Sequence, residues 1–183
     1  MSINEIKAKT RKVMSEWKDV FGFAPDTAAN KLYDARLDWI IELTDCLEIW
    51  SKKGVFLTEG ELLLARANLG AVTEGWLKFF YCVYYEDYIK NPKKDTKGNI
   101  REPNELSFEL LKQSSRTILW ETNDDWDLWV GSVQSKRNAI HAFNDKEIGT
   151  PILFMEDLDK LMEFIKLICG RLPDIEDHPK YNS

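Results

Sequence analysis

Residues 125–143, DWDLWVGSVQSKRNAIHAF, have the periodicity of a helix with one apolar side. At about 100° per residue, Arg137 falls near the centre of this apolar stripe and His141 lies at its edge. A buried guanidinium without a partner is very costly, so packing alone does not explain this pair. We therefore interpret it as the first candidate functional site. The apolar members of the stripe are Trp126, Trp129, Val130, Val133 and Ile140.

The rest of the chain also shows helical periods and helical caps. Asn123-Asp124-Asp125 is a cap whose negative charge suits a helix start, and Thr150-Pro151 opens the last helix. Thr58 and Glu61 form a capping-box pattern. We find no period-two pattern that would indicate strands. The sequence predicts helices over residues 3–20, 25–53, 58–88, 104–118, 125–143 and 151–169.

These elements predict an all-α, single-domain bundle of five or six helices. We assign residues 1–173 to this helical domain and residues 174–183 to a polar C-terminal tail. His178 lies in that tail, where we expect it to be incidental.

Composition limits the functions to consider. The 183-residue chain has a net charge of −6, so it lacks the broad basic field typical of nucleic-acid-binding proteins. Cys46, Cys82 and Cys169 show no metal-binding spacing, and we expect reduced core thiols in a cytoplasmic protein. We find no signal peptide and no run long enough to span a membrane. We therefore expect no metal site, no cofactor and no membrane attachment.

Glu74 lies within the apolar stripe of the long helix predicted over residues 58–88. A carboxylate at such a position needs a partner, and Arg137 is the natural candidate by chemistry. One interpretation is a structural ion pair between core helices. The other is that Glu74 supports a functional Arg137 by orienting or neutralising it.

The segment at residues 91–104, NPKKDTKGNIREPN, is predicted to be a solvent-exposed loop because it combines Pro, Gly and several charges. Its basic side chains are able to contact RNA phosphates. A purely solvated loop is the alternative. The candidate RNA-binding residues are Lys93, Lys94, Lys97 and Arg101.

The pattern Arg137-Asn138-Ala139-Ile140-His141 resembles the signature of the HEPN superfamily, a group of all-α bundles. That signature is an Arg followed by a polar residue such as Asn, and then by a His four to six residues further on, late in a helix. The resemblance covers residues 135–143. Three residues separate Arg137 from His141, one fewer than in the usual form.

The resemblance implies a metal-independent ribonuclease in which two copies of the motif meet across a homodimer. His141 would act as general acid and base, Arg137 would bind the scissile phosphate, and Asn138 would position one of them. It also implies a cytoplasmic toxin or phage-defence effector, with an antitoxin or another protein as a candidate partner. A dimer interface would explain an Arg on an apolar stripe.

Two other functions remain open from the sequence. One is a non-catalytic, dimeric, HEPN-like module that binds RNA, a nucleotide or a protein partner. The other is a helical protein with a purely structural, interacting role, in which Arg137 pairs with Glu74 and His141 suits the negative end of its helix. The net charge and the short spacing favour these two, whereas the placement of the Arg, Asn and His favours the ribonuclease.

Overall fold

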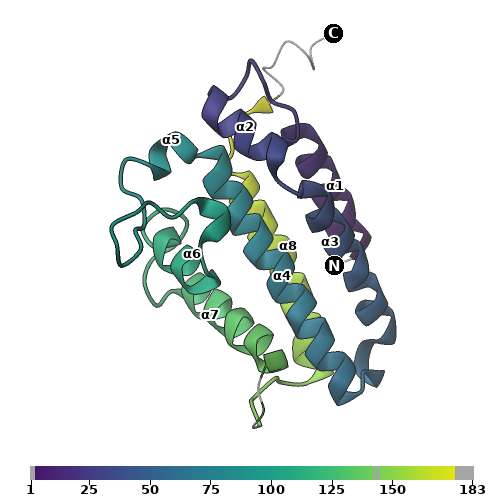
Figure 1. Cartoon of the computed structure of the whole chain (residues 1–183). Coiled ribbons are helices and arrows are strands. Elements are labelled where there is room, and N and C mark those ends of the chain that lie inside the picture. Colours follow the sequence, from purple (N-terminus) through teal and green to yellow (C-terminus); the bar gives the residue numbers. More distant parts are fainter. Residues whose placement is uncertain (1–2, 142, 144, 176–183) are drawn as a thin grey trace.

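The longest helix, α4 (Glu59–Val83), runs through the centre of the bundle (Figure 1). The computed structural model describes residues 3–141, 143 and 145–175. Thr58 caps α4 with the predicted capping box, because its hydroxyl accepts from the Glu61 amide at 3.4 Å and its own amide donates to the Glu61 carboxylate at 3.0 Å. Trp76 and Phe79 of α4 are buried and pack edge to face at 5.6 Å.

Seven further α-helices surround or extend α4 within the described residues. In Figure 1, α1 and α3 lie on one side of α4, whereas α6 and α7 lie on the other, and α8 runs alongside it. These helices are α1 (Ile3–Trp17), α2 (Asp26–Asp34), α3 (Leu37–Lys53), α5 (Tyr85–Tyr88), α6 (Phe108–Ser115), α7 (Asp125–Asn138) and α8 (Pro151–Cys169). The single-turn 3-10 helices are η1 (Gly54–Phe56), η2 (Pro103–Glu105) and η3 (Ala139–His141).

The predicted all-α, single-domain fold is confirmed, and the described residues form no strand beyond isolated bridges. None of the helices in the described part of the chain has the length and hydropathy that crossing a membrane would require. The core is a continuous cluster that includes Trp17 of α1, Trp76 of α4 and Phe164 of α8.

The helix predicted over residues 25–53 is two helices, because the chain becomes extended at Ala35. Arg36 then folds back and its guanidinium bonds to the Asp38 carboxylate at 2.6 Å. Leu37, Thr44 and Leu47 are the buried residues of α3. Trp39 is 54% exposed and Cys46 is also exposed, so the prediction that Cys46 is a core thiol was wrong.

Three other predicted helices extend beyond the helices that the structure shows. The first helix ends at Trp17, and the central helix ends at Val83, where Tyr84 leaves the helical conformation before the short α5. The fourth helix begins after Ser107, whose hydroxyl accepts from the Leu110 amide, and not after Asn104. In the first and the central helix, the apolar pattern continues past the last residue that the backbone keeps helical.

The second residue of the predicted tail is packed. Ile175 is only 8% exposed and belongs to the core cluster. His178 lies outside the described residues.

Candidate site at the end of helix α7

Helix α7 is held in place at its first turn. The Asp124 carboxylate caps it by accepting from the amides of Trp126 at 2.8 Å and Asp127 at 2.9 Å, which confirms the predicted acidic cap. Asp127 is buried and accepts two bonds, of 2.9 and 3.0 Å, from the Arg116 guanidinium. This bidentate pair lowers the pKa of the Asp127 carboxyl and ties α7 to the end of α6.

Arg137 lies in the last turn of α7 against the middle of α4. A Cβ at Gly70 would stand only 2.4 Å from both Cβ and Cγ of Arg137, so the absence of a side chain at Gly70 lets the two helices approach. The guanidinium donates from Nη2 to the Glu74 carboxylate at 3.2 Å and from Nη1 to the Asn138 side chain at 3.1 Å. The predicted contact between Glu74 and Arg137 is therefore confirmed.

Glu74 is shared between two cations. Its other oxygen lies 2.8 Å from the Lys78 ammonium, and its side chain is 13% exposed. The Arg137 side chain remains 34% exposed. Arg137 is thus held by a mostly buried carboxylate but is not closed off from solvent.

The helix changes character directly after Asn138. Ala139–His141 forms a 3-10 turn, which winds more tightly than an α-helix. The predicted stripe therefore holds only in part: Trp129, Val130 and Val133 are buried, but Ile140 is 40% exposed. His141 is exposed as well, and the prediction that it stands one turn above Arg137 on a continuous α-helix was wrong.

A buried ionic cluster lies next to this site, and it was not predicted from the sequence. The Arg66 guanidinium is 1% exposed, donates to the Asp157 carboxylate of α8, and donates from Nε to the Ile148 carbonyl at 2.9 Å. Asp157 also accepts from the Trp129 indole at 2.8 Å and from Lys136 at 3.2 Å. Burial lowers the pKa of Arg66, and the charge of Asp157 opposes that effect.

The sequence does contain a pattern from which this cluster could have been predicted. Arg66, Gly70 and Glu74 are spaced by four in the sequence, so they share one face of α4. That face receives the end of α7, with Lys136 bound at the Arg66 end and Arg137 at the Glu74 end. The partner Asp157 interrupts the apolar stripe of α8 in the same way.

The basic loop lies apart from the end of α7, beside α5 and α6 (Figure 1). It is folded back on itself: the Asp95 carboxylate accepts from the amides of Lys97 at 2.8 Å and Asn99 at 2.9 Å. The Tyr88 hydroxyl donates to the Arg101 carbonyl at 2.5 Å and accepts from the Lys93 amide at 3.2 Å. Lys94 and Lys97 are exposed, whereas Lys93 is half-buried.

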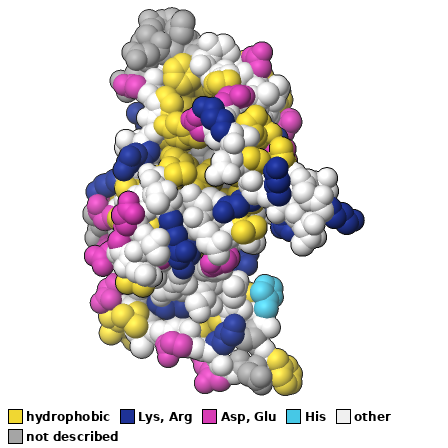
Figure 2. Space-filling model, turned by 90° about the vertical axis from the view of Figure 1, so that its left-hand side faces the viewer, with side chains coloured by type: hydrophobic (Ala, Val, Ile, Leu, Met, Phe, Trp, Pro, Cys, Tyr) yellow, Lys and Arg dark blue, Asp and Glu magenta, His cyan; other side chains and the backbone are white. Residues whose placement is uncertain are grey.

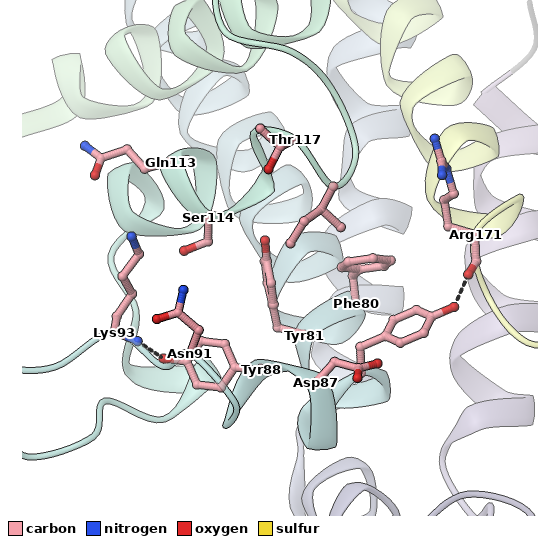
Figure 3. A pocket seen from close by; sticks show the side chains of 12 residues that line it. Phe80, Tyr81, Asp87, Tyr88, Asn91, Lys93, Gln113, Ser114, Thr117 and Arg171 are labelled. Carbon is pink, nitrogen blue, oxygen red and sulfur yellow. Dashed lines mark hydrogen bonds between the residues drawn. The ribbon is translucent and has the colours of Figure 1, made fainter.

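A cavity of about 680 Å³ opens where α4, α5, α6 and the end of α8 meet (Figure 3). Lys93 lines it, whereas Arg137, Asn138, His141 and Glu74 are absent from the described lining residues. The face of the molecule that carries α5, α6 and α7 shows hydrophobic side chains gathered in its upper part, with Lys and Arg among them (Figure 2). The structure therefore presents two separate candidate regions.

No protein-family model, no curated protein and no solved structure matches this chain. The resemblance to the HEPN superfamily therefore depends on residues 135–143 alone.

Proposed function

We propose that this chain is a HEPN-like, metal-independent endoribonuclease whose reactive groups lie at the end of α7. The observation that carries the proposal is the Arg137 guanidinium, fixed by Glu74 and Asn138 yet one-third exposed, close in the chain to the exposed His141. In the cell such an enzyme would serve as a cytoplasmic toxin or phage-defence effector, restrained by an antitoxin or another protein partner.

The proposed reaction is an attack of the RNA 2′-hydroxyl on the adjacent phosphorus. A bond forms between O2′ and phosphorus, and the bond from phosphorus to O5′ breaks. His141 takes the proton of the 2′-hydroxyl, and the His141 of a second copy in the homodimer gives a proton to O5′. The products are a 2′,3′-cyclic phosphate and a free 5′-hydroxyl.

Arg137 would stabilise the charge that develops on the phosphate. A guanidinium has five N–H donors, and the structure uses one toward Glu74 and one toward Asn138. Donors therefore remain for phosphate oxygens while Glu74 still orients the group. The partial exposure of the side chain leaves it accessible to a strand at the surface.

The second candidate function is a non-catalytic dimeric module that binds RNA, a nucleotide or a protein partner. It is favoured by the end of α7 at Asn138, which removes His141 from the helical turn that holds Arg137. In that case the pair of Arg137 and Glu74 stabilises the packing of α7 on α4.

The test is cleavage of a broad set of RNAs in EDTA by the wild type, Arg137→Ala and His141→Ala. Ser135→Ala is the matched control, because Ser135 is exposed on the same end of α7. Cleavage that is lost in the first two variants and kept in the control, with melting temperatures little changed, supports the ribonuclease. A wild type that cleaves none of the RNAs excludes the ribonuclease and leaves the binding module.

A further inference from the structure

The cavity at the end of α4 has a wall of four aromatic rings, Phe80, Tyr81, Tyr84 and Tyr88. The ring centroids of Phe80 and Tyr84 lie 4.9 Å apart, and those of Tyr81 and Tyr88 lie 5.9 Å apart. Phe80, Tyr81 and Tyr88 are only 3%, 4% and 7% exposed, whereas Tyr84 is half-buried. A flat ring would therefore meet this wall mainly at Tyr84, by stacking or by edge contact. The volume of about 680 Å³ is that of a site for a small organic ligand.

The tyrosine hydroxyls of this wall are held by the protein itself. Tyr84 donates to the Arg171 carbonyl (Figure 3). Tyr81 bonds to Ser115 at 3.2 Å, and Tyr88 donates to the Arg101 carbonyl at 2.5 Å. These bonds fix the rings in place before any ligand arrives. The wall is therefore preorganised, which reduces the entropic cost of binding.

Neutral polar groups complete the cavity. The Ser114 hydroxyl is buried and has no hydrogen-bond partner among the described residues. Asn91 and Gln113 carry amides that both donate and accept, and Figure 3 shows Asn91 on the same side of Tyr81 as Ser114. A buried polar group without a partner is unfavourable, so a ligand that bonds to Ser114 would gain affinity.

The charges at the cavity favour an anionic ligand. Lys93 and Arg171 line it, and the only described acid in its lining, Asp87, is already bound to Lys90 at 2.6 Å. This balance is positive although the whole chain carries a net charge of −6. The local charge therefore points to a ligand with a negative group.

We propose that this cavity binds a nucleotide, with the base against the aromatic wall and the phosphate at Lys93. A base offers the flat ring and a polar edge for Ser114, Asn91 and Gln113, and the phosphate supplies the negative charge. The site is separate from Arg137 and does not depend on RNA cleavage. The second candidate function includes nucleotide binding. The present inference rests on that function and assigns the binding to this cavity.

The test is calorimetric titration of the full-length protein with the four nucleoside 5′-monophosphates and the four matching nucleosides. We expect saturable binding of at least one monophosphate, and affinity about tenfold or more weaker for its nucleoside, because a charge-assisted bond is lost. Ribose 5-phosphate is the probe without a base and should bind weakly. A short single-stranded oligoribonucleotide is titrated into His141→Ala, in which cleavage is prevented. Comparing its affinity with that of the free monophosphates shows whether the cavity prefers a nucleotide within an RNA strand or a free nucleotide.

Matched variants locate the binding. Lys93→Ala should weaken binding about tenfold, whereas Lys94→Ala, which removes the same charge from an exposed neighbour outside the cavity lining, should not. Asn91→Ala should also weaken it, and Arg137→Ala should retain it. The proposal is overturned if no monophosphate binds, if ribose 5-phosphate binds as tightly as the nucleotides, or if Lys93→Ala and Lys94→Ala behave alike. RNA cleavage is measured in a separate assay, so the ribonuclease proposal and the nucleotide-binding proposal can each fail without the other.

Discussion

At the scale of single residues, the contact between α4 and α7 depends on the absence of a side chain at Gly70. This glycine lies inside a helix, where its flexibility is a cost, and the close approach of Arg137 explains why it is there. The sequence predicted that Glu74 needs a partner and that Arg137 is the natural candidate. It was unable to show the distance that joins them, since that distance depends on the position of α7.

We expect Gly70→Ala to destabilise the protein by about 1–3 kcal/mol, because the new methyl group would meet Arg137 Cβ, an atom that cannot move without the backbone of α7. Gly60→Ala is the control within α4, since its Cβ would meet no atom within 4 Å. Urea unfolding of the two variants measures the difference. Equal stability of both variants would show that Arg137 does not pack on Gly70.

Removal of the Asp157 side chain should strongly lower the free energy of unfolding. Its removal leaves the fully buried Arg66 without its carboxylate, and breaking a buried pair costs about 3–5 kcal/mol. We therefore expect Asp157→Ala to unfold at much lower urea concentration than Glu156→Ala, a change at the exposed neighbour. A loss below about 1 kcal/mol for Asp157→Ala would mean that the Arg66 charge finds another partner.

At the scale of elements, period and caps predicted most helix starts, whereas helix ends were harder to place. Thr58, Asp124 and Thr150 cap the helices that they were predicted to cap, because each side-chain oxygen accepts a nearby backbone amide. The breaks at Ala35 and after Asn138 carry no Gly or Pro, so no local sequence signal marks them. Their cost is tolerated because tertiary packing of the neighbouring helices compensates for it.

The start of α7 should make folding sensitive to acid. The pKa of Asp127 is lowered in the folded state, so its contribution to stability is complete above the ordinary carboxyl pKa and is lost as the pH falls toward the lowered value. We expect Asp127→Asn to show a shallower loss of stability in acid than the wild type. Asp125→Asn, at an exposed position of the same turn, should follow the wild-type profile. Identical profiles for the wild type and Asp127→Asn would contradict this assignment.

At the scale of the whole molecule, the fold places two polar features at different regions of one bundle. The end of α7 carries Arg137 and His141, and the cavity near α5 carries the aromatic wall and Lys93. The sequence predicted the site with Arg137 and His141 and the basic side chains of the loop at residues 91–104, but it did not predict the cavity. The cavity is built from residues of three separate segments, and no local pattern reports such an arrangement.

The proposed ribonuclease requires two copies of the chain, and Ile140 is an exposed apolar residue beside the reactive groups. We expect a homodimer by analytical ultracentrifugation, and we expect Ile140→Asp to weaken the dimer and RNA cleavage together. Ile49→Asp places the same charge at an exposed position of α3, on the other side of the bundle, and should change neither. A wild type that is monomeric while it cleaves RNA would refute the two-copy site.

Attack by the 2′-hydroxyl is tested with one RNA in two forms, with and without a single 2′-deoxy substitution at the cleaved nucleotide. We expect the wild type to cleave the unmodified RNA in EDTA, to leave a 2′,3′-cyclic phosphate, and to leave the substituted position intact. Cleavage at the 2′-deoxy position, or no cleavage of any RNA, would contradict this mechanism.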